Sequence, residues 1–356
     1  MAEHIKYPSI EQFRNVVRAV QNKARYYKDE DGEAAFDMTK PLPTLQFTGS
    51  VKLHGTNAGI RFQLNDPENF VCQSRERDVA IGDDNAGFAA YVHENKEEFL
   101  WVFRKIKTEL LMELEAEIAY HRLSPTVIVY GEWCGGNIQK SVAINQLPKM
   151  FVLFGIKVFL SEDSWYWLSE DDINRFCMDK SHFNLHSVYS FPTFGPIEID
   201  FNYPERSQNV LRDLTVAVEE QCPVAKALGV DGVGEGIVWK CITLPYTGSE
   251  FMFKVKGEKH SASKVRTLAA VDTERLENIE SLVESLVSEN RLLQGLDYLR
   301  ASGLEIDQTN TGAFLKWIVG DVLKEESDTI TESGFEKKDV TPFMSKKAKI
   351  WFFERI

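Results

Sequence analysis

The segment SVKLHGTNAG (50–59) places a lysine, a histidine and a glycine within four positions. The residues before it alternate between apolar and polar types, which predicts a strand with Lys52 and His54 on its polar face. A lysine held among other cations gives up its proton more readily, and the free amine is a nucleophile. Gly55 would let a bulky ligand approach the backbone. A surface lysine on a hairpin explains the same residues, because four-residue matches are common.

Two further lysines have a spacing that suits phosphate binding. Lys254 and Lys256, in EFMFKVK, are two residues apart, so both project from one face of a predicted strand, while Val255 faces the core. Paired amines at this spacing can flank one phosphate as point charges. A position on the exposed, polar edge of a sheet would explain the two lysines equally well. The pair begins the basic run FKVKGEKHSASKVR (253–266).

Two carboxylates and an aromatic pair stand at the ends or inside other predicted strands. Glu235 begins EGIVWK and is a candidate magnesium ligand, because Mg²⁺ needs only one or two protein carboxylates beside phosphate oxygens. Glu132, in YGEW, could accept hydrogen bonds from ribose hydroxyls, or form a salt bridge at a strand end. Phe151 and Phe154, in MFVLFG, could stack on a base, although a core position is the more frequent role.

The elements that must position these residues follow from periodicity. Ser9 and Gln12 resemble a capping box that opens an amphipathic helix. The apolar face of the first strand changes phase after Gly55, which predicts a hairpin with its turn at this glycine. Residues 86–119 have a helical pattern. Further strands are predicted at 126–133, 150–160, 235–240 and 250–256.

The character of the chain changes near Arg266, where apolar residues take up helical spacing. We therefore expect two domains, residues 1–265 and 266–356, of which the second is small and all-helical.

The bulk composition excludes several classes of protein. The chain has 356 residues and a net charge of −13, which argues against a non-specific nucleic-acid binder but is compatible with a local basic cleft. No apolar run is long enough to predict a membrane span, and the N-terminal residues lack the apolar core of a signal peptide. Five scattered cysteines without a CxxC pair predict neither a disulfide framework nor a zinc site, and suit a reducing cytosol.

The order of these motifs is more specific than any one of them. K-x-H-G, S-R, G-E-W, an aromatic strand, E-G-I-V-x-K and K-V-K follow one another between Gln46 and Lys256. This series resembles the covalent nucleotidyltransferase superfamily of ligases and capping enzymes. KLHGTN, with histidine where DNA ligases and capping enzymes usually carry aspartate, is similar to the phage RNA ligase 2-like family of ATP-dependent RNA ligases. The helical C-terminal region is also similar to that family, and no sixth motif is present.

The resemblance implies an α+β fold. The expected nucleotidyltransferase (ATP-grasp-like ligase) domain consists of antiparallel sheets with flanking helices. In it, Lys52 would be the nucleophile that takes AMP as a phosphoramidate. The same resemblance places in the pocket His54, Gly55, Asn57 and Lys240.

Three further residues are assigned to the nucleotide by the resemblance. Arg75 would contact the ribose and the RNA end, although Arg77 is a rival because the local spacing fits both. Glu132 would hold the ribose hydroxyls, and Phe154 would stack on adenine.

The phosphates and the metal would be held by residues from the last two motifs. Lys254 and Lys256 would bind the α-phosphate, and Glu235 would help to organise Mg²⁺, or Mn²⁺ in its place. Val51 and Gly155 stand where phage relatives carry acidic residues, so adenine recognition would rest more on backbone groups.

The resemblance implies ATP-dependent sealing of 5′-phosphate and 3′-hydroxyl RNA ends in a nicked RNA duplex or an RNA–DNA hybrid. The enzyme is expected to be monomeric, not membrane-bound, and cytoplasmic (in the host cytoplasm if phage-encoded). Three alternatives stay open. A capping-type guanylyltransferase would form lysyl-GMP. A DNA nick ligase would usually carry an oligonucleotide-binding domain, and an end-binding protein would have lost catalysis.

Overall fold

A computed structural model describes most of the chain. The described residues are 4–29, 31–37, 40–84, 86–121, 124–161, 163–178, 183–257 and 272–356. The expected domain boundary near Arg266 and the rest of the basic run, 258–266, lie outside these ranges.

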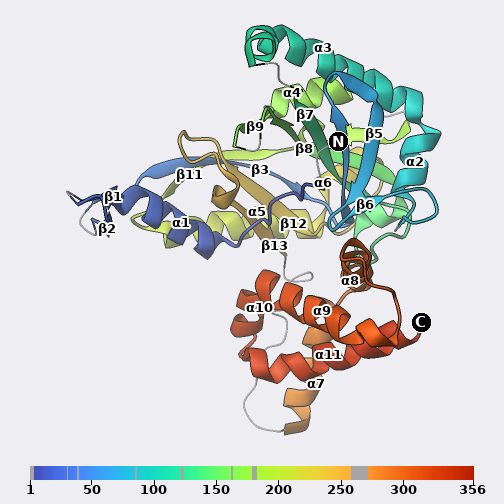
Figure 1. The fold of residues 1–356 in the computed structure, drawn as a ribbon. Coiled ribbons are helices and arrows are strands. Elements are labelled where there is room, and N and C mark those ends of the chain that lie inside the picture. Colours follow the sequence, from blue (N-terminus) through green and yellow to red (C-terminus); the bar gives the residue numbers. More distant parts are fainter. Residues whose placement is uncertain are drawn as a thin grey trace.

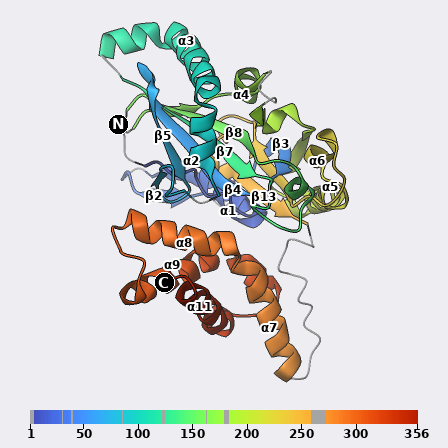
Figure 2. The ribbon, with the colours of Figure 1, turned by 90° about the vertical axis from the view of Figure 1, so that its right-hand side faces the viewer.

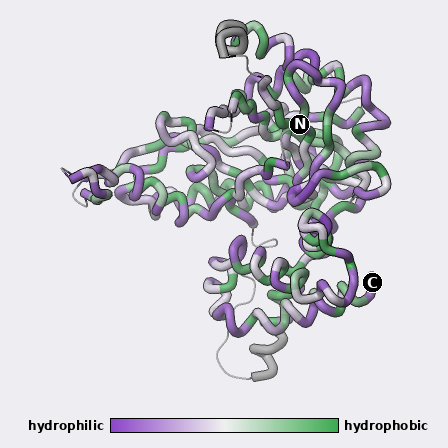
Figure 3. The backbone as a smooth tube through the Cα atoms, viewed as in Figure 1, coloured by the Kyte–Doolittle hydropathy of each residue, from purple (hydrophilic) through white to green (hydrophobic). Residues whose placement is uncertain are grey.

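The described chain forms two bodies, each with its own core (Figure 1). Residues 4–257, called here the N-terminal domain, contain both large sheets and one continuous cluster of buried apolar side chains. Residues 272–356, called the C-terminal domain, contain helices and a second cluster that shares no residue with the first. The apolar segments run through the interior of both bodies (Figure 3).

The larger sheet has seven strands in the order β10-β8-β7-β4-β5-β6, with β9 paired to β8. Its pairs are antiparallel, as expected, except β10 with β8, which is parallel. The strands are β4 (Thr56–Gln63), β5 (Asp66–Ser74), β6 (Asp78–Val79), β7 (Thr126–Cys134), β8 (Met150–Phe159), β9 (Trp165–Trp167) and β10 (Leu185–Ser187).

The smaller sheet has four antiparallel strands in the order β11-β3-β12-β13. They are β3 (Thr44–Lys52), β11 (Phe194–Asp200), β12 (Gly236–Cys241) and β13 (Met252–Lys256). A separate two-stranded ribbon projects from the domain and consists of β1 (Tyr26–Lys28) and β2 (Ala34–Phe36) (Figure 1).

Helices cover the outer faces of the two sheets. The larger sheet contacts α2 (Phe88–Glu94), α3 (Lys96–His121) and α4 (Glu170–Cys177), and the smaller one contacts α1 (Phe13–Arg25) and α5 (Gln208–Glu220). A short α6 (Pro223–Ala227) follows α5. The C-terminal domain has α7 (Asp272–Leu286), α8 (Glu289–Ala301), α9 (Thr311–Glu325), α10 (Ser327–Glu332) and α11 (Lys337–Phe353). The helical pattern over 86–119 is confirmed as two helices, α2 and α3, separated at Asn95, and the helical C-terminal region is confirmed too.

The predicted hairpin at Gly55 is wrong. β3 pairs with β11 and β12, whereas β4 pairs with β5 and β7, so the chain passes at Gly55 from one sheet to the other. The apolar face of the chain does change phase at Gly55. The reason is that β3 and β4 belong to different sheets, so each strand turns its apolar face to different partners. A side chain at Gly55 would lie 2.3 Å from the carbonyl oxygen of Trp133, so the glycine permits close packing.

The predicted capping box at Ser9 is also wrong. α1 begins at Phe13, and its N-cap Gln12 makes no side-chain capping bond. The hydroxyl of Ser9 donates instead to Glu325 of the C-terminal domain, at 3.0 Å. Ser9 therefore donates to a distant carboxylate and does not accept from a backbone N–H of α1.

No helix among the described residues is long and apolar enough to span a bilayer. The five cysteines are buried free thiols.

Candidate active site

The register of the smaller sheet brings distant motifs together. Lys52, the last residue of β3, lies opposite Gly236 of β12, and Gly236 lies opposite Lys256 of β13. Glu235 directly precedes Gly236. The nucleophile candidate, the metal-ligand candidate and one lysine of the phosphate pair therefore stand in a row across three strands.

Glu235 is the centre of this row. Its carboxylate is 2.7 Å from the Lys52 amine, 3.1 Å from Nδ1 of His54 and 3.6 Å from the Lys256 amine. Its side chain is only 2% exposed. Burial alone would raise the pKa of the Glu235 carboxyl, but Lys52, His54 and Lys256 hold it well below its usual range. The nearest charged partner of Lys52 is thus a carboxylate, and not another cation as the sequence suggested.

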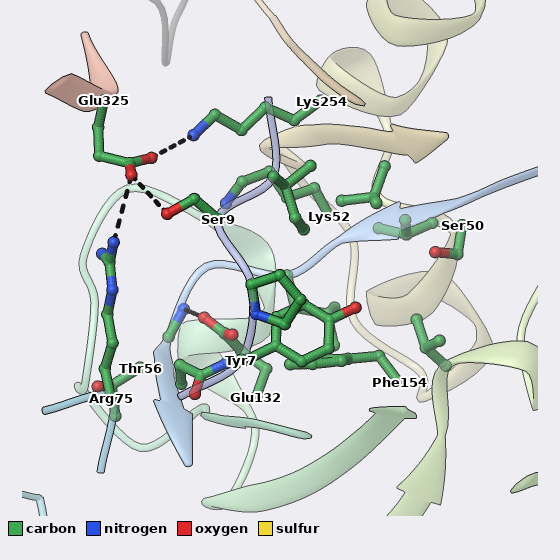
Figure 4. A pocket seen from close by; sticks show the side chains of 18 of the residues that line it. Tyr7, Ser9, Ser50, Lys52, Thr56, Arg75, Glu132, Phe154, Lys254 and Glu325 are labelled. Atoms are coloured by element: carbon green, nitrogen blue, oxygen red, sulfur yellow. Dashed lines mark hydrogen bonds and ion pairs between the residues drawn. The ribbon is translucent and has the colours of Figure 1, made fainter. Parts of the chain in front are cut away.

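A pocket of about 220 Å³ opens beside Lys52 (Figure 4). It is bordered by the ends of β3 and β4, by β7, β8 and β13, and by the segment before α1. Eight of the predicted site residues line it: Lys52, Gly55, Asn57, Arg75, Glu132, Phe154, Lys240 and Lys254. His54, Glu235 and Lys256 are joined to Lys52 through the carboxylate contacts described above.

Glu132 lies at the floor of this pocket, where β7 pairs with β4. One carboxylate oxygen accepts a hydrogen bond from the backbone N–H of Gly55, at 2.8 Å. Burial raises the pKa of Glu132 to about 7, although Lys52 and the Gly55 bond act in the opposite direction. The other carboxylate oxygen accepts no hydrogen bond from the part of the chain that the structure describes, and it is suited to accept from a hydroxyl of a ligand.

Aromatic residues form one wall of the pocket. The ring of Phe154 meets the ring of Tyr7 edge to face, with centroids 4.8 Å apart. Lys240 lies beneath: its amine donates to the backbone oxygen of Phe154 at 3.1 Å and contacts the Tyr189 hydroxyl. Burial lowers the pKa of Lys240 to about 8. The buried Lys240 amine is hydrogen-bonded to β8 in this way and helps to hold Phe154 in position.

The two candidate arginines lie in different surroundings. Arg75 lines the pocket and approaches Glu325 at 3.4 Å. Arg77 is turned away: its guanidinium contacts Asp83 at 2.8 Å and Asp297 of α8 at 3.0 Å. The geometry therefore favours Arg75 as the arginine of the site.

Several pocket residues were not expected from the sequence. Tyr7 and Ser9 come from the segment before α1, and Gln294 and Glu325 come from the C-terminal domain. Ser9 had a local explanation as a helix cap, and the two C-terminal residues lie in regular helical patterns. No local signal identifies them, because their place in the site depends on how the domains dock.

A family model described as RNA ligase matches residues 45–256. The chain belongs to the RNA ligase family. The matched range, well over half of the chain, ends at the last residue of β13 and confirms the resemblance at the level of the family. Comparison with curated proteins gives no match.

Solved structures of an RNA ligase from Naegleria gruberi are similar to part of the chain. The complex with PPi is 15% identical, with a TM-score of 0.41. A variant with ATP and Mn is 15% identical, with a TM-score of 0.42. Each comparison covers 73% of this chain, which spans only 58% of the length of that ligase chain.

Proposed function

We propose that the chain is an ATP-dependent ligase that joins the 5′-phosphate and 3′-hydroxyl ends of RNA through a lysyl-AMP intermediate. Membership of the RNA ligase family supports the reaction class. The observation that carries the mechanism is the position of Lys52. Its amine lies at the edge of a pocket that also contains Glu132, Phe154 and Lys254, which can take the ribose, the base and the phosphate of one nucleotide.

In the first step, Nζ of Lys52, after its ammonium group has passed a proton to solvent, attacks the α-phosphorus of ATP. A nitrogen–phosphorus bond forms, the bond to the β-phosphate oxygen breaks and pyrophosphate leaves. Lys254 and Lys256 lie on the same side of β13 and neutralise negative charge that builds up on the phosphate oxygens. The pocket holds the reacting atoms in place, which removes much of the entropic cost of the encounter.

Glu235 fits a divalent cation as a single buried carboxylate. Among the described residues no group of three or more metal-ligating side chains occurs. Mg²⁺ and Mn²⁺ do not need one, since they bind one or two carboxylates together with water and phosphate oxygens. A bound cation would supply charge neutralisation at the phosphates. If Glu235 held such a cation, its carboxylate would no longer pair with the Lys52 amine.

The two later steps use the same pocket. The 5′-phosphate of an RNA strand attacks the phosphorus of lysyl-AMP, the nitrogen–phosphorus bond breaks and a 5′–5′ adenylated end forms. The 3′-hydroxyl of the second strand then attacks the RNA phosphate, and AMP leaves. Arg75, which lines the pocket, would hold the RNA end.

A labelling experiment tests the first step. The full chain is incubated with ATP or GTP labelled at the α-phosphate, with Mg²⁺ or Mn²⁺, and resolved on a denaturing gel. We expect label from ATP on the wild type and on Lys226→Ala, an exposed lysine of α6, but not on Lys52→Ala. The bond should be acid-labile and sensitive to hydroxylamine. Equal labelling of Lys52→Ala would refute the assignment.

The rival functions give different outcomes in the same experiment. Label from GTP alone would indicate a capping-type enzyme. Sealing of nicked DNA but not of nicked RNA would indicate a DNA ligase. A protein that binds RNA ends yet takes no label under any of these conditions would be an end-binding relative that has lost catalysis.

A further inference from the structure

Three carboxylates of the C-terminal domain face the cations of the candidate active site. Asp321 and Glu325 lie on α9, and Glu326 lies between α9 and α10. We call them the acidic cluster. Glu325 is 3.2 Å from the amine of Lys254, and Glu326 is 3.5 Å from the amine of Lys256. The cluster therefore engages the two lysines assigned above to the α-phosphate.

Arg75 is a third cation of the N-terminal domain that contacts the acidic cluster. Its guanidinium approaches Glu325 at 3.4 Å and Asp321 at 3.6 Å. Glu325 itself lines the pocket, where it also accepts from Ser9 (Figure 4). One carboxylate thus binds a lysine, an arginine and a hydroxyl from three separate parts of the N-terminal domain, as a phosphate group would.

The acidic cluster is buried at the domain contact. Its side chains are between 8% and 9% exposed. Buried carboxylates are costly unless they are paired. Within the described part of its own domain the cluster contacts one cation, Arg291, which lies 3.0 Å from Asp321 and 3.5 Å from Glu326. The Thr329 hydroxyl also donates to Glu326, at 3.0 Å. The other charged partners of the cluster are Arg75, Lys254 and Lys256 of the N-terminal domain, so the cluster is adapted to this contact.

Contacts outside the acidic cluster also hold the domains in this arrangement. Arg77 meets the buried Asp297 of α8, and the Asn290 side chain donates to the backbone oxygen of Gly55 at 3.2 Å. Both α8 and the acidic cluster lie on the side of the C-terminal domain that faces the sheets (Figure 2). The docked arrangement is therefore supported at several points.

We propose that the acidic cluster takes the place of phosphate groups on the N-terminal domain, so that the docked C-terminal domain inhibits nucleotide binding and must move away before lysyl-AMP forms. The inference rests on the proposed function, because it identifies the occupied cations as the phosphate site. A carboxylate and a phosphate compete for the same N–H donors. If only the undocked fraction binds ATP, the apparent affinity falls by that fraction.

The test compares lysyl-AMP formation in the full chain at ATP concentrations below saturation. Glu325→Gln and Glu326→Gln weaken the contact by removing one negative charge each. Each should raise the initial rate roughly threefold to tenfold, because the undocked fraction grows. Glu305→Gln, an exposed residue in the same domain, removes the same charge and should leave the rate unchanged.

A second variant weakens the docking without touching the phosphate-binding cations. Asp297→Asn removes the charge opposite Arg77 and should also raise the rate at low ATP. Thermal unfolding establishes that each variant is folded. Folded Glu325→Gln and Glu326→Gln proteins that form lysyl-AMP no faster than wild type overturn the inference.

X-ray scattering in solution separates this inference from the proposed function. The radius of gyration of the Glu325→Gln/Glu326→Gln double variant should exceed that of the wild type, whether or not either protein is active. If no protein takes label from ATP, the proposed function is wrong. The scattering then still shows whether the C-terminal domain separates from the N-terminal domain in the double variant. An unchanged radius of gyration in the double variant overturns the release.

Discussion

The charges of the candidate active site converge on Glu235. This carboxylate contacts Lys52, His54 and Lys256 within 3.6 Å, although its side chain is almost fully buried. In the absence of ligands the candidate nucleophile is therefore held in an ion pair. The ion pair also fixes the orientation of the Lys52 amine. Glu235 therefore restrains the nucleophile before a nucleotide binds and orients it for the attack.

The two lysines of β13 should be needed for adenylation, and the valine between them should not. Lys254→Ala and Lys256→Ala each remove a charge that meets the phosphate in the transition state, at a cost of about 3 kcal/mol, or roughly a hundredfold in rate. Val255→Ala removes apolar contacts and should mainly lower stability. Single-turnover adenylation at saturating ATP measures the rates. Normal rates in both lysine variants would show that β13 does not hold the phosphate.

The pairing of individual strands explains why motifs that are far apart in the sequence lie close together in the site. β12 pairs with β3 on one side and β13 on the other, so Lys52 and Lys256, about 200 positions apart in the chain, lie in one row. The passage of the chain from β3 to β4 at Gly55 then joins this row to the floor of the pocket, because the Gly55 N–H donates to Glu132. The site depends on the relative position of two sheets.

Gly55→Ala should damage both stability and activity. The added Cβ would lie 2.3 Å from the Trp133 oxygen and 2.6 Å from Cβ of Cys134, so the backbone must move. We expect a loss of about 2 kcal/mol in the free energy of unfolding and slower adenylation. Gly320→Ala is the control. Its Cβ meets open space on α9, and it should gain up to about 1 kcal/mol. Denaturant unfolding measures both, and an undisturbed Gly55→Ala protein would contradict the packing argument.

The sequence predicted the strands that carry the motifs better than it predicted their connections. Alternation places Lys52 and Lys254 on polar strand faces regardless of partners, because the side-chain period is a local property. The pairing of β3 is not local. A hairpin and a passage between sheets give the same change of apolar phase at Gly55. The prediction that Ser9 caps a helix was wrong for a related reason: Glu325, which accepts its hydrogen bond, is more than 300 residues away.

At the scale of the whole molecule, two cores meet at a polar contact. The buried apolar clusters of the two domains share no side chain. Their contact is made by ion pairs and hydrogen bonds such as Arg77–Asp297 and Asn290–Gly55. Domains joined in this way can separate without exposing a large apolar surface.

Residues 1–265 should therefore fold without the C-terminal domain. We expect this fragment to form lysyl-AMP, and at low ATP to do so faster than the full chain, because the acidic cluster is absent. It should seal nicked RNA poorly, because we expect the C-terminal domain to help hold the duplex. Adenylation and sealing are measured side by side with the full chain as control. Full sealing by the fragment would remove any role of the C-terminal domain in that step.

The domain contact should weaken in acid. Burial alone would raise the pKa of Glu326, but Lys256 and Arg291 lower it to about 2, from 4.5 in the unfolded chain. A lowered carboxyl pKa stabilises the folded state above about pH 4.5, and this contribution is lost as the pH falls toward 2. It amounts to at most about 3 kcal/mol.

Denaturant unfolding of wild type and Glu326→Gln measures this contribution directly. The difference in free energy of unfolding should be largest near pH 7 and shrink below about pH 4.5. A difference that stays constant down to pH 3 would show that the ion pairs of Glu326 do not stabilise the contact.

The buried thiols make the movement of the domains open to direct observation. Burial raises the pKa of the five cysteine thiols, to about 12 at Cys72 and Cys177. Since the thiolate is the reactive form, maleimide dyes should leave the native cysteines untouched. Lys226→Cys and Glu305→Cys would then place one fluorophore on each domain of an otherwise unaltered chain. Energy transfer between the dyes could follow opening in real time, molecule by molecule, as ATP is added.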